Sequence, residues 1–152
     1  MKKQLQVSAI KEGSVIDHIP AKVLFQVIQL LKLEDFSEPM TVGSNLESTK
    51  LGRKAIIKVA NYFFKDEEIN KIALVAPEAK LNIIRDYKVA EKKKVEVPDE
   101  IVGFARCINP KCITNNENVT TKFQVHKDGS EVSLECHYCE KITDKEHIQI
   151  KS

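Results

Sequence analysis

The chain has 152 residues, of which 42% are hydrophobic and 30% are charged, with only 5 Gly and 5 Pro. This composition is typical of a folded globular protein and excludes a long disordered or fibrous segment. The formal net charge is only +2, with 17 Lys and Arg against 15 Asp and Glu up to residue 100, and 7 against 7 after it. Proteins that bind nucleic acid usually carry a strongly basic domain. The nearly neutral charge of both parts of this chain therefore argues against a nucleic-acid-binding protein.

The sequence shows no membrane or export signal. No apolar run approaches the roughly 18 residues that a membrane span needs, and the first residues lack the apolar stretch of a signal peptide. We therefore expect a cytoplasmic protein.

The first part of the chain alternates strand patterns with helix patterns. Residues 4–10 alternate apolar and polar side chains, as a half-buried strand does. Asp17 and Pro20 are typical of a helix start, and apolar residues then recur at helical spacing to about Leu33. Residues 40–46 and 55–64 are typical of two strands joined as a hairpin.

A second helix and a fourth strand complete this part. Asp66 can cap a helix that Pro77 ends, and residues 81–89 indicate a strand. The order strand, helix, strand, strand, helix, strand is the split βαβ pattern of ferredoxin-like sheets. Residues 91–98 have little pattern and predict a connector. We predict an α+β protein, with a ferredoxin-like βαββαβ domain over residues 1–98 and a small all-β zinc-ribbon or rubredoxin-like domain over residues 99–152.

The second domain holds all the cysteines, in two close pairs. The spacing is C-x4-C, then 23 intervening residues, then C-x2-C. In a reducing compartment, two such pairs predict one tetrahedral metal site rather than disulfides. The predicted Zn²⁺ ligands are Cys107, Cys112, Cys136 and Cys139.

A closed tetrathiolate leaves no position for substrate, so the metal is predicted to be structural, at one ion per chain. Two alternatives stay open. A redox dithiol at Cys136 and Cys139 would leave the other pair without a reason, and an iron centre could use the same four ligands. His126, His137 and His147 are more often surface residues than ligands in such a setting.

Residues 6–20, QVSAIKEGSVIDHIP, and the cysteine pairs together closely resemble the regulatory chain of aspartate carbamoyltransferase. The likeness covers nearly the whole chain. Its further points are Gly52-Arg53-Lys54, Lys58, Asn82, Tyr87, Val89, Lys92 and the knuckle Cys136-His137-Tyr138-Cys139-Glu140-Lys141.

The resemblance implies a subunit without catalytic activity that binds nucleoside triphosphates in its first domain and grips the catalytic chain through its zinc domain. It implies that such chains form homodimers through their first domains, and that three dimers join two catalytic trimers. CTP, with UTP, would inhibit the first committed step of pyrimidine synthesis, and ATP would stimulate it. The nucleotide-binding residues that it implies are Ala9, Ile10, Val15, Asp17, His18, Lys58, Asn82, Ile84, Tyr87, Val89 and Lys92.

The residue types themselves are compatible with nucleotide binding, independently of the resemblance. Lys58 and Lys92, on or just past neighbouring strands, could converge on one phosphate tail, and His18 near a helix N-terminus could add a donor. Asp17 could accept from a ribose hydroxyl, although alone it is more often a helix cap. No phosphate loop or glycine-rich fingerprint is present, so spacing alone does not reveal a nucleotide site.

The resemblance also implies which residues contact the catalytic chain. It assigns Asn109 and Glu140 to this contact. Lys111 stands where the best-known members carry asparagine, and Asp128 where a basic residue is expected, so these two positions depart from the pattern.

Two other functional classes fit the sequence less well. An enzyme is disfavoured because the metal site is closed and no nucleophile has an evident His and acid arrangement nearby. A nucleic-acid-binding zinc ribbon is disfavoured because the second domain is charge-neutral and lacks a basic stripe with aromatic residues.

Overall fold

The computed structural model describes residues 9–129 and 131–151. The chain divides into two compact units, Met1–Glu96 and Val97–Ser152. Among the described residues, every helix is too short or too polar to span a bilayer.

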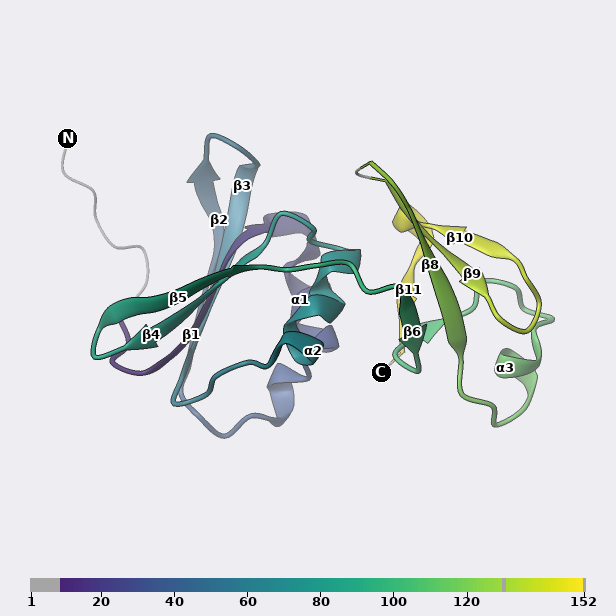
Figure 1. Cartoon of the computed structure of the whole chain (residues 1–152), viewed down its shortest axis with the longest axis horizontal. Coiled ribbons are helices and arrows are strands. Elements are labelled where there is room, and N and C mark those ends of the chain that lie inside the picture. The colour runs from purple at the N-terminus through teal and green to yellow at the C-terminus, as the bar shows by residue number, and fades with distance from the viewer. Residues whose placement is uncertain (1–8, 130, 152) are drawn as a thin grey trace. The chain divides into compact units, whose positions relative to one another are not determined.

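The first unit is a five-stranded antiparallel sheet with helices on one side of it (Figure 1). The strand order is β2-β3-β1-β4-β5. The strands are β1 (Gly13–Pro20), β2 (Met40–Ser48), β3 (Gly52–Ala60), β4 (Lys80–Arg85) and β5 (Lys88–Lys94). The helices are α1 (Leu24–Leu30) and α2 (Asp66–Ile69), with 3-10 turns at Ala21–Val23, Leu33–Asp35 and Asn70–Leu74.

The core of this unit lies between the sheet and the helices. Inward-facing residues of the central strands β1, β3 and β4 are buried, as are apolar residues on one side of the helices. The buried set includes Ile16, Ile57 and Leu81 from the strands and Val27, Leu30 and Ile72 from the helical segments. Because side chains alternate along a strand, the neighbours of the inward-facing residues point to the opposite face. That outer face carries the candidate site.

The predicted fold class is confirmed, since β1, α1, β2, β3, α2 and β4 follow the ferredoxin-like order and β5 is added at the edge. Some element boundaries were wrong. The predicted strand over residues 4–10 lies mostly outside the described residues, and residues 9 and 10 are not in a strand. The first strand of the sheet is instead β1, over residues where the sequence predicts none. Asp17 does not cap a helix, because β1 runs on to Pro20 and the first helix begins beyond it. Asp66 is the first residue of α2 rather than its cap, and the backbone N–H of Lys65 donates to the Glu68 carboxylate, 2.9 Å away.

The predicted strand over residues 81–89 is in fact two strands. It turns back at Asp86 and Tyr87, which both have positive φ angles, and β5 then continues to Lys94. Lys92 therefore lies within β5, and the first half of the segment predicted as a connector is strand. No Gly marks this turn, so the pattern gave no signal of it.

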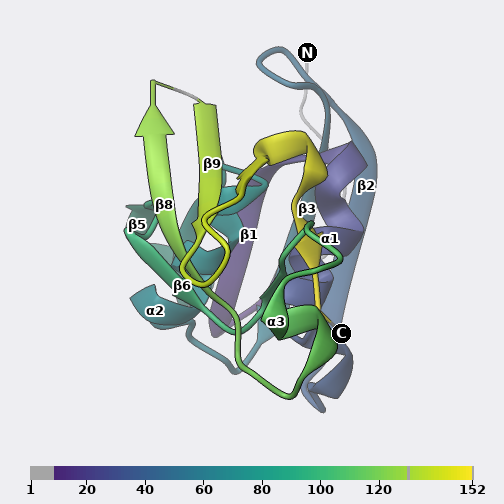
Figure 2. The same cartoon turned by 90° about the vertical axis from the view of Figure 1, so that its right-hand side faces the viewer.

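The second unit is a small β structure, and its strands β6, β8 and β9 are labelled in Figure 2. A four-stranded antiparallel sheet has the order β10-β9-β8-β6, and β11 pairs with β7. Its core contains Ile101, Phe123, Leu134 and Ile148, all buried. The elements are β6 (Glu100–Val102), β7 (Ala105–Arg106), α3 (Ile113–Asn116), β8 (Lys122–Asp128), β9 (Glu131–Cys136), β10 (Ile142–Asp144), a 3-10 turn at Lys145–His147 and β11 (Gln149–Ile150).

Candidate functional site

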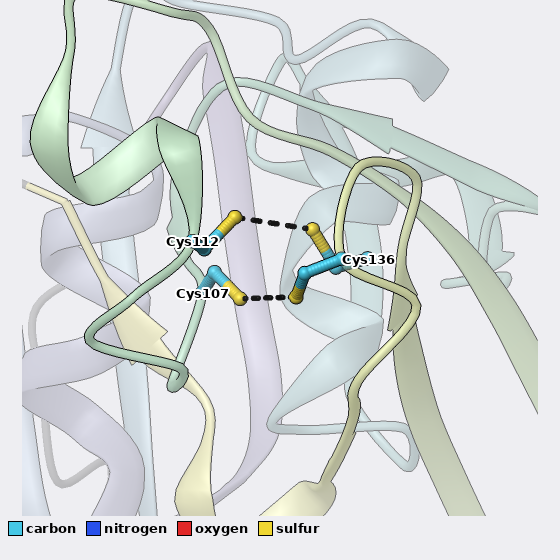
Figure 3. Close-up of side chains that lie close together, drawn as sticks. Cys107, Cys112 and Cys136 are labelled. Atoms are coloured by element: carbon cyan, nitrogen blue, oxygen red, sulfur yellow. Dashed lines mark hydrogen bonds between the residues drawn. The ribbon is translucent and has the colours of Figure 1, made fainter.

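Four cysteines converge in the second unit. Figure 3 shows the thiols of Cys107, Cys112 and Cys136 turned toward a common centre. The Sγ atoms of Cys107 and Cys139 are 3.6 Å apart, those of Cys112 and Cys136 are 3.7 Å apart, and all four lie within 4.8 Å of one another. A tetrahedral site with zinc to sulfur bonds of about 2.3 Å has sulfur atoms about 3.8 Å apart. The four thiols thus fit a tetrathiolate metal centre.

The first cysteine knuckle is held by two consecutive amide side chains of α3. Asn115 Nδ2 donates to the carbonyl oxygens of Cys107 and Asn109, at 2.9 and 2.7 Å. Asn116 Nδ2 donates to the carbonyls of Pro110 and Cys112, at 3.0 and 2.9 Å. Both ends of the C-x4-C loop are therefore fixed by the short helix that follows it. Sequence reasoning missed these residues, because an Asn-Asn pair has no metal-binding signature of its own.

The second knuckle is held by its backbone. The Glu140 N–H donates to the Cys136 carbonyl at 2.9 Å, and the Cys136 N–H donates to the Lys141 carbonyl at 3.0 Å. Glu140 adopts a φ of 63°, which closes the turn. This tight turn brings Cys139 back over Cys136.

The thiols differ in how readily they ionise. Burial raises the pKa of the Cys107 and Cys136 thiols. Burial also opposes ionisation of Cys139, but the Lys141 N–H and the side chains of Asn109, Cys107 and Cys136 outweigh it and bring the Cys139 pKa down to about 7. Because only thiolates ligate metal, a bound cation would offset the cost of ionising the buried pair.

The histidines predicted to lie at the surface are exposed and take no part in the cysteine cluster. His126 Nε2 lies 2.8 Å from the Glu135 carboxylate, and His147 Nδ1 bonds Asp144. The His137 ring packs edge-on against Tyr138. The convergence of both cysteine pairs on one centre also favours metal over a redox dithiol at Cys136 and Cys139 alone.

In the first unit, four of the predicted nucleotide-binding residues stand in one row across the sheet. Val15 pairs with Lys58 on one side and with Asn82 on the other, and Asn82 pairs with Lys92. Residues paired in this way point to the same face, and it is the face opposite the helices. Neighbouring strands are about 4.8 Å apart, so the two lysines stand about 14 Å apart along the row with Val15 and Asn82 between them.

A second row lies toward one end of the strands and is apolar. Gly13 pairs with Ile84, and Ile84 pairs with Val89, which is 47% exposed. The Ile10 side chain lies beside this apolar row. Its Cδ1 atom is only 3.0 Å from the position that a Cβ atom on Gly13 would occupy. Ala9 is exposed just before Ile10.

The turn between β4 and β5 lies at this same end. The Tyr87 N–H donates to the Lys11 carbonyl at 3.0 Å, so the segment that precedes β1 runs alongside the turn. The structure thus brings Ile10 and Tyr87 to the apolar end of the outer face.

Asp17 and His18 form an irregularity in β1. The pairing of β1 with β3 shifts between Ile16 and Ile19, and His18 has a φ of 61°. The Asp17 carboxylate accepts from the His18 N–H at 2.6 Å and lies 3.0 Å from Lys54 Nζ. The ring atom His18 Nδ1 is buried and has no hydrogen-bond partner among the described residues. The expected helix N-terminus at His18 was therefore wrong, because this residue belongs to the bulge of a strand.

Three lysines that sequence reasoning did not assign to the site also belong to the outer face. Lys54 reaches Asp17, and Asp17 pairs in register with Lys80, which pairs with Lys94. The signal for Lys54 was its even spacing from Lys58 on one strand, whereas Lys80 and Lys94 required the register. We call this surface the lysine face, defined by Lys54, Lys58, Lys80, Lys92 and Lys94.

The surroundings of Lys58 affect how readily it carries its charge. Burial lowers the pKa of Lys58, and the charge of Asp17 acts against this effect. Cross-strand lysines that face each other repel, so an anion bound among them would relieve the repulsion.

The two residues predicted to contact a catalytic chain lie beside the cysteine cluster in the second unit. The Asn109 side-chain oxygen accepts from the Lys111 N–H at 3.0 Å, and its backbone carbonyl accepts from the Cys112 N–H at 3.0 Å. Glu140 is exposed next to Cys139, and Asp128 is exposed at the end of β8.

Comparison with known proteins identifies family models and related chains that match this sequence. The family model described as "Aspartate carbamoyltransferase regulatory chain, allosteric domain" matches residues 5–96, and the one described as "Aspartate carbamoyltransferase regulatory chain, metal binding domain" matches residues 99–149. Aspartate carbamoyltransferase regulatory chains of Phocaeicola vulgatus and Bacteroides thetaiotaomicron are each 56% identical over 149 residues, 98% of this chain and 96% and 97% of theirs. The corresponding chain of Pyrococcus abyssi is 56% identical over 147 residues, covering 95% of this chain and 96% of its own.

Proposed function

The chain belongs to the family of aspartate carbamoyltransferase regulatory chains, and from this premise we propose that it binds nucleoside triphosphates on its first unit and the catalytic chain through its second. CTP, UTP and ATP are the proposed effectors. The reaction that they control, the first committed step of pyrimidine synthesis, takes place on the catalytic chains in the cytoplasm. The chain described here regulates that step and does not catalyse it.

The observation that carries the nucleotide proposal is the row of Lys58, Val15, Asn82 and Lys92 across four strands. A triphosphate needs several cations that approach from different sides. Lys58 and Lys92 stand at the two ends of the row, and their flexible side chains can close on a phosphate tail that lies between them.

The other predicted site residues indicate how the nucleotide is oriented on this face. Asp17 offers carboxylate oxygens that can accept from ribose hydroxyls, and His18 can add a donor beside it. The apolar row that includes Ile84 and Val89 suits a nucleobase, with backbone groups near Ile10 and Tyr87 at its edge. The base then lies toward the β4–β5 turn and the phosphates toward the lysine face.

We propose that the metal is Zn²⁺, bound once per chain by Cys107, Cys112, Cys136 and Cys139. Four thiolates at tetrahedral spacing fill the coordination sphere and leave no position for water or substrate. The ion therefore serves folding, and it supplies free energy that a unit of this small size cannot obtain from its apolar core alone. Iron suits the same ligand set, and metal analysis of the purified chain distinguishes the two.

The surface beside the cysteine knuckles is the proposed contact with the catalytic chain. Asn109 and Glu140 supply polar groups there, and the adjacent Ile113 and Tyr138 are large apolar side chains left exposed. Fixing this surface would be the function of the metal. The proposed assembly has two catalytic trimers and three regulatory dimers, with each dimer formed through the first units.

Regulation would then follow from differential affinity. A nucleotide that binds the lysine face more tightly in one quaternary state shifts the assembly toward that state. Because such coupling is reciprocal, filling the catalytic sites should change the affinity for CTP by the same factor that CTP changes theirs.

The experiment that tests the nucleotide site is calorimetric titration of CTP and ATP into the whole chain and its Lys92→Ala variant. Loss of a charge-assisted contact costs about 1.5 to 3 kcal/mol, so affinity should fall about tenfold or more. Lys93→Ala is the matched control, because Lys93 is the next residue of β5 and pairs instead with Asp66, 3.1 Å away. Unchanged CTP and ATP affinity in both Lys92→Ala and Lys58→Ala would show that the lysine face does not bind the triphosphate.

A further inference from the structure

The turn between β4 and β5 is held in an unfavourable conformation. Asp86 and Tyr87 form a two-residue connection between the paired residues Arg85 and Lys88, and their φ angles are 52° and 65°. Two-residue turns of this kind need left-handed backbone at both positions, which is why Asn-Gly and Asp-Gly are usual there. Aspartate tolerates the conformation, but a tyrosine in it is strained.

Burial of the Tyr87 ring does not offset this strain, because the residue is 66% exposed. The turn is held instead through its backbone. The Asp86 N–H donates to Glu12 Oε2 at 2.6 Å, and the Tyr87 N–H donates to the Lys11 carbonyl at 3.0 Å. Both turn amides therefore bond to two consecutive residues that lie just before β1.

Glu12 is itself fixed in place on two sides. Its carbonyl accepts from the Asn61 N–H at 2.8 Å, which ties the residue to the end of β3. On the other side, Arg85 Nη1 lies 4.0 Å from Glu12 Oε1, and the same guanidinium stacks over the Phe63 ring with its Cζ 4.2 Å from the ring centre. The carboxylate thus reaches the turn from a supported position.

This contact joins the two segments that the proposed function gives to the nucleobase. Ile10 precedes Glu12 by two residues, and Tyr87 follows the amide that Glu12 accepts from. The phosphate-binding row passes through Val15 instead, two residues further along β1 than the apolar row at Gly13. Glu12 can therefore influence one end of the ligand without touching the other.

We propose that Glu12 is a positioning residue for the nucleobase: its carboxylate holds the strained Asp86–Tyr87 turn against the segment that contains Ile10, and so sets the affinity for the nucleoside part of the effector. This inference rests on the proposed function. It requires that Glu12 matter for nucleotides and not for a bare phosphate chain.

The test is calorimetric titration of the whole chain with three probes: CTP, ATP and inorganic tripolyphosphate. Glu12→Ala should weaken CTP and ATP binding about threefold to tenfold and leave tripolyphosphate affinity unchanged. Glu12→Gln retains an oxygen that can accept from the Asp86 N–H but loses the charge, so its loss should be smaller. Glu78→Ala is the control, because it removes another exposed ion pair of this unit, with Lys50 at 3.1 Å, and should change neither.

The outcomes separate the inference from its premise. A wild-type chain that binds none of the three probes overturns the proposed function and this inference with it. A wild-type chain that binds all three, with Glu12→Ala unchanged for CTP or weakened equally for CTP and tripolyphosphate, overturns the inference alone. If Glu12→Ala does not fold, as judged by circular dichroism, Glu12→Gln is judged by the same ratio.

Discussion

The two candidate sites are assembled in opposite ways. The four cysteines of the second unit lie on two short knuckles, each closed by hydrogen bonds to residues within a few positions of it. The lysine face of the first unit comes from three strands, β3, β4 and β5, and depends on their register with one another and with β1. A site of the first kind can be recognised from spacing, whereas a site of the second kind exists only once the sheet has formed.

The units also differ in what should hold them together. The first unit buries apolar side chains from both its sheet and its helices, including Ile16, Ile57 and Ile72. The second unit is smaller and places three of its cysteines among its buried residues. We therefore expect the second unit to depend on metal and the first to be indifferent to it.

We expect the removal of a metal ligand to have the largest effect. Cys136→Ser should abolish metal binding and unfold residues beyond about 100, because metal binding supplies roughly 10 to 16 kcal/mol in small zinc domains. Metal content by mass spectrometry and hydrogen exchange of the two units measure this. A variant without metal whose second unit stays protected from exchange would show that the metal is not structural.

A smaller loss, confined to the other unit, is expected from Gly13→Ala. An added side-chain carbon would lie 2.1 Å from the Val59 carbonyl, and Gly13 has a φ of 146°. Strain of this kind costs about 1 to 3 kcal/mol, which lowers the melting temperature of a domain of this size by at least about 4 °C. Gly52→Ala has a positive φ but open space, so it should cost less. A fall in metal content of Gly13→Ala would contradict the independence of the units.

The smallest effect is expected from removing support around the metal. Asn115→Ala deletes two hydrogen bonds to the first knuckle while leaving all four thiols. Outer residues that orient ligands typically change metal affinity by roughly tenfold or more, so the variant should release metal faster to a chelator. Asn118→Ala, an exposed asparagine beyond the same short helix, is the control. Equal release rates for the two variants would mean that the Asn115 amide does not support the site.

Much of the fold could be predicted because its signals are local. Apolar periodicity predicts the elements from α1 to β4, and the cysteine spacing predicts the cluster in the second unit. The first strand is predicted at residues 4–10, whereas the sheet begins with β1. The helix start at Asp17 failed for a tertiary reason, since Lys54 and the pairing with β4 keep Asp17 in a strand. The β4–β5 hairpin was missed because its turn contains no glycine.

The lysine face shows the limit of sequence reasoning more clearly. The resemblance supplied Lys58 and Lys92, but only the register puts Asn82 between them and adds Lys80 and Lys94 beside Asp17. One residue of slip in β5 would turn Lys92 toward the helices, because successive side chains face opposite ways. No local pattern in the sequence determines that pairing.

We expect effector binding and metal-dependent anchoring to belong to separate units. The most direct test measures CTP affinity by calorimetry and metal content on the same preparations of wild type, Lys92→Ala and Cys136→Ser. We predict that Lys92→Ala keeps one metal ion per chain and loses CTP affinity about tenfold or more, whereas Cys136→Ser loses the metal and keeps wild-type CTP affinity. Loss of CTP binding in Cys136→Ser, or loss of metal in Lys92→Ala, would contradict this separation.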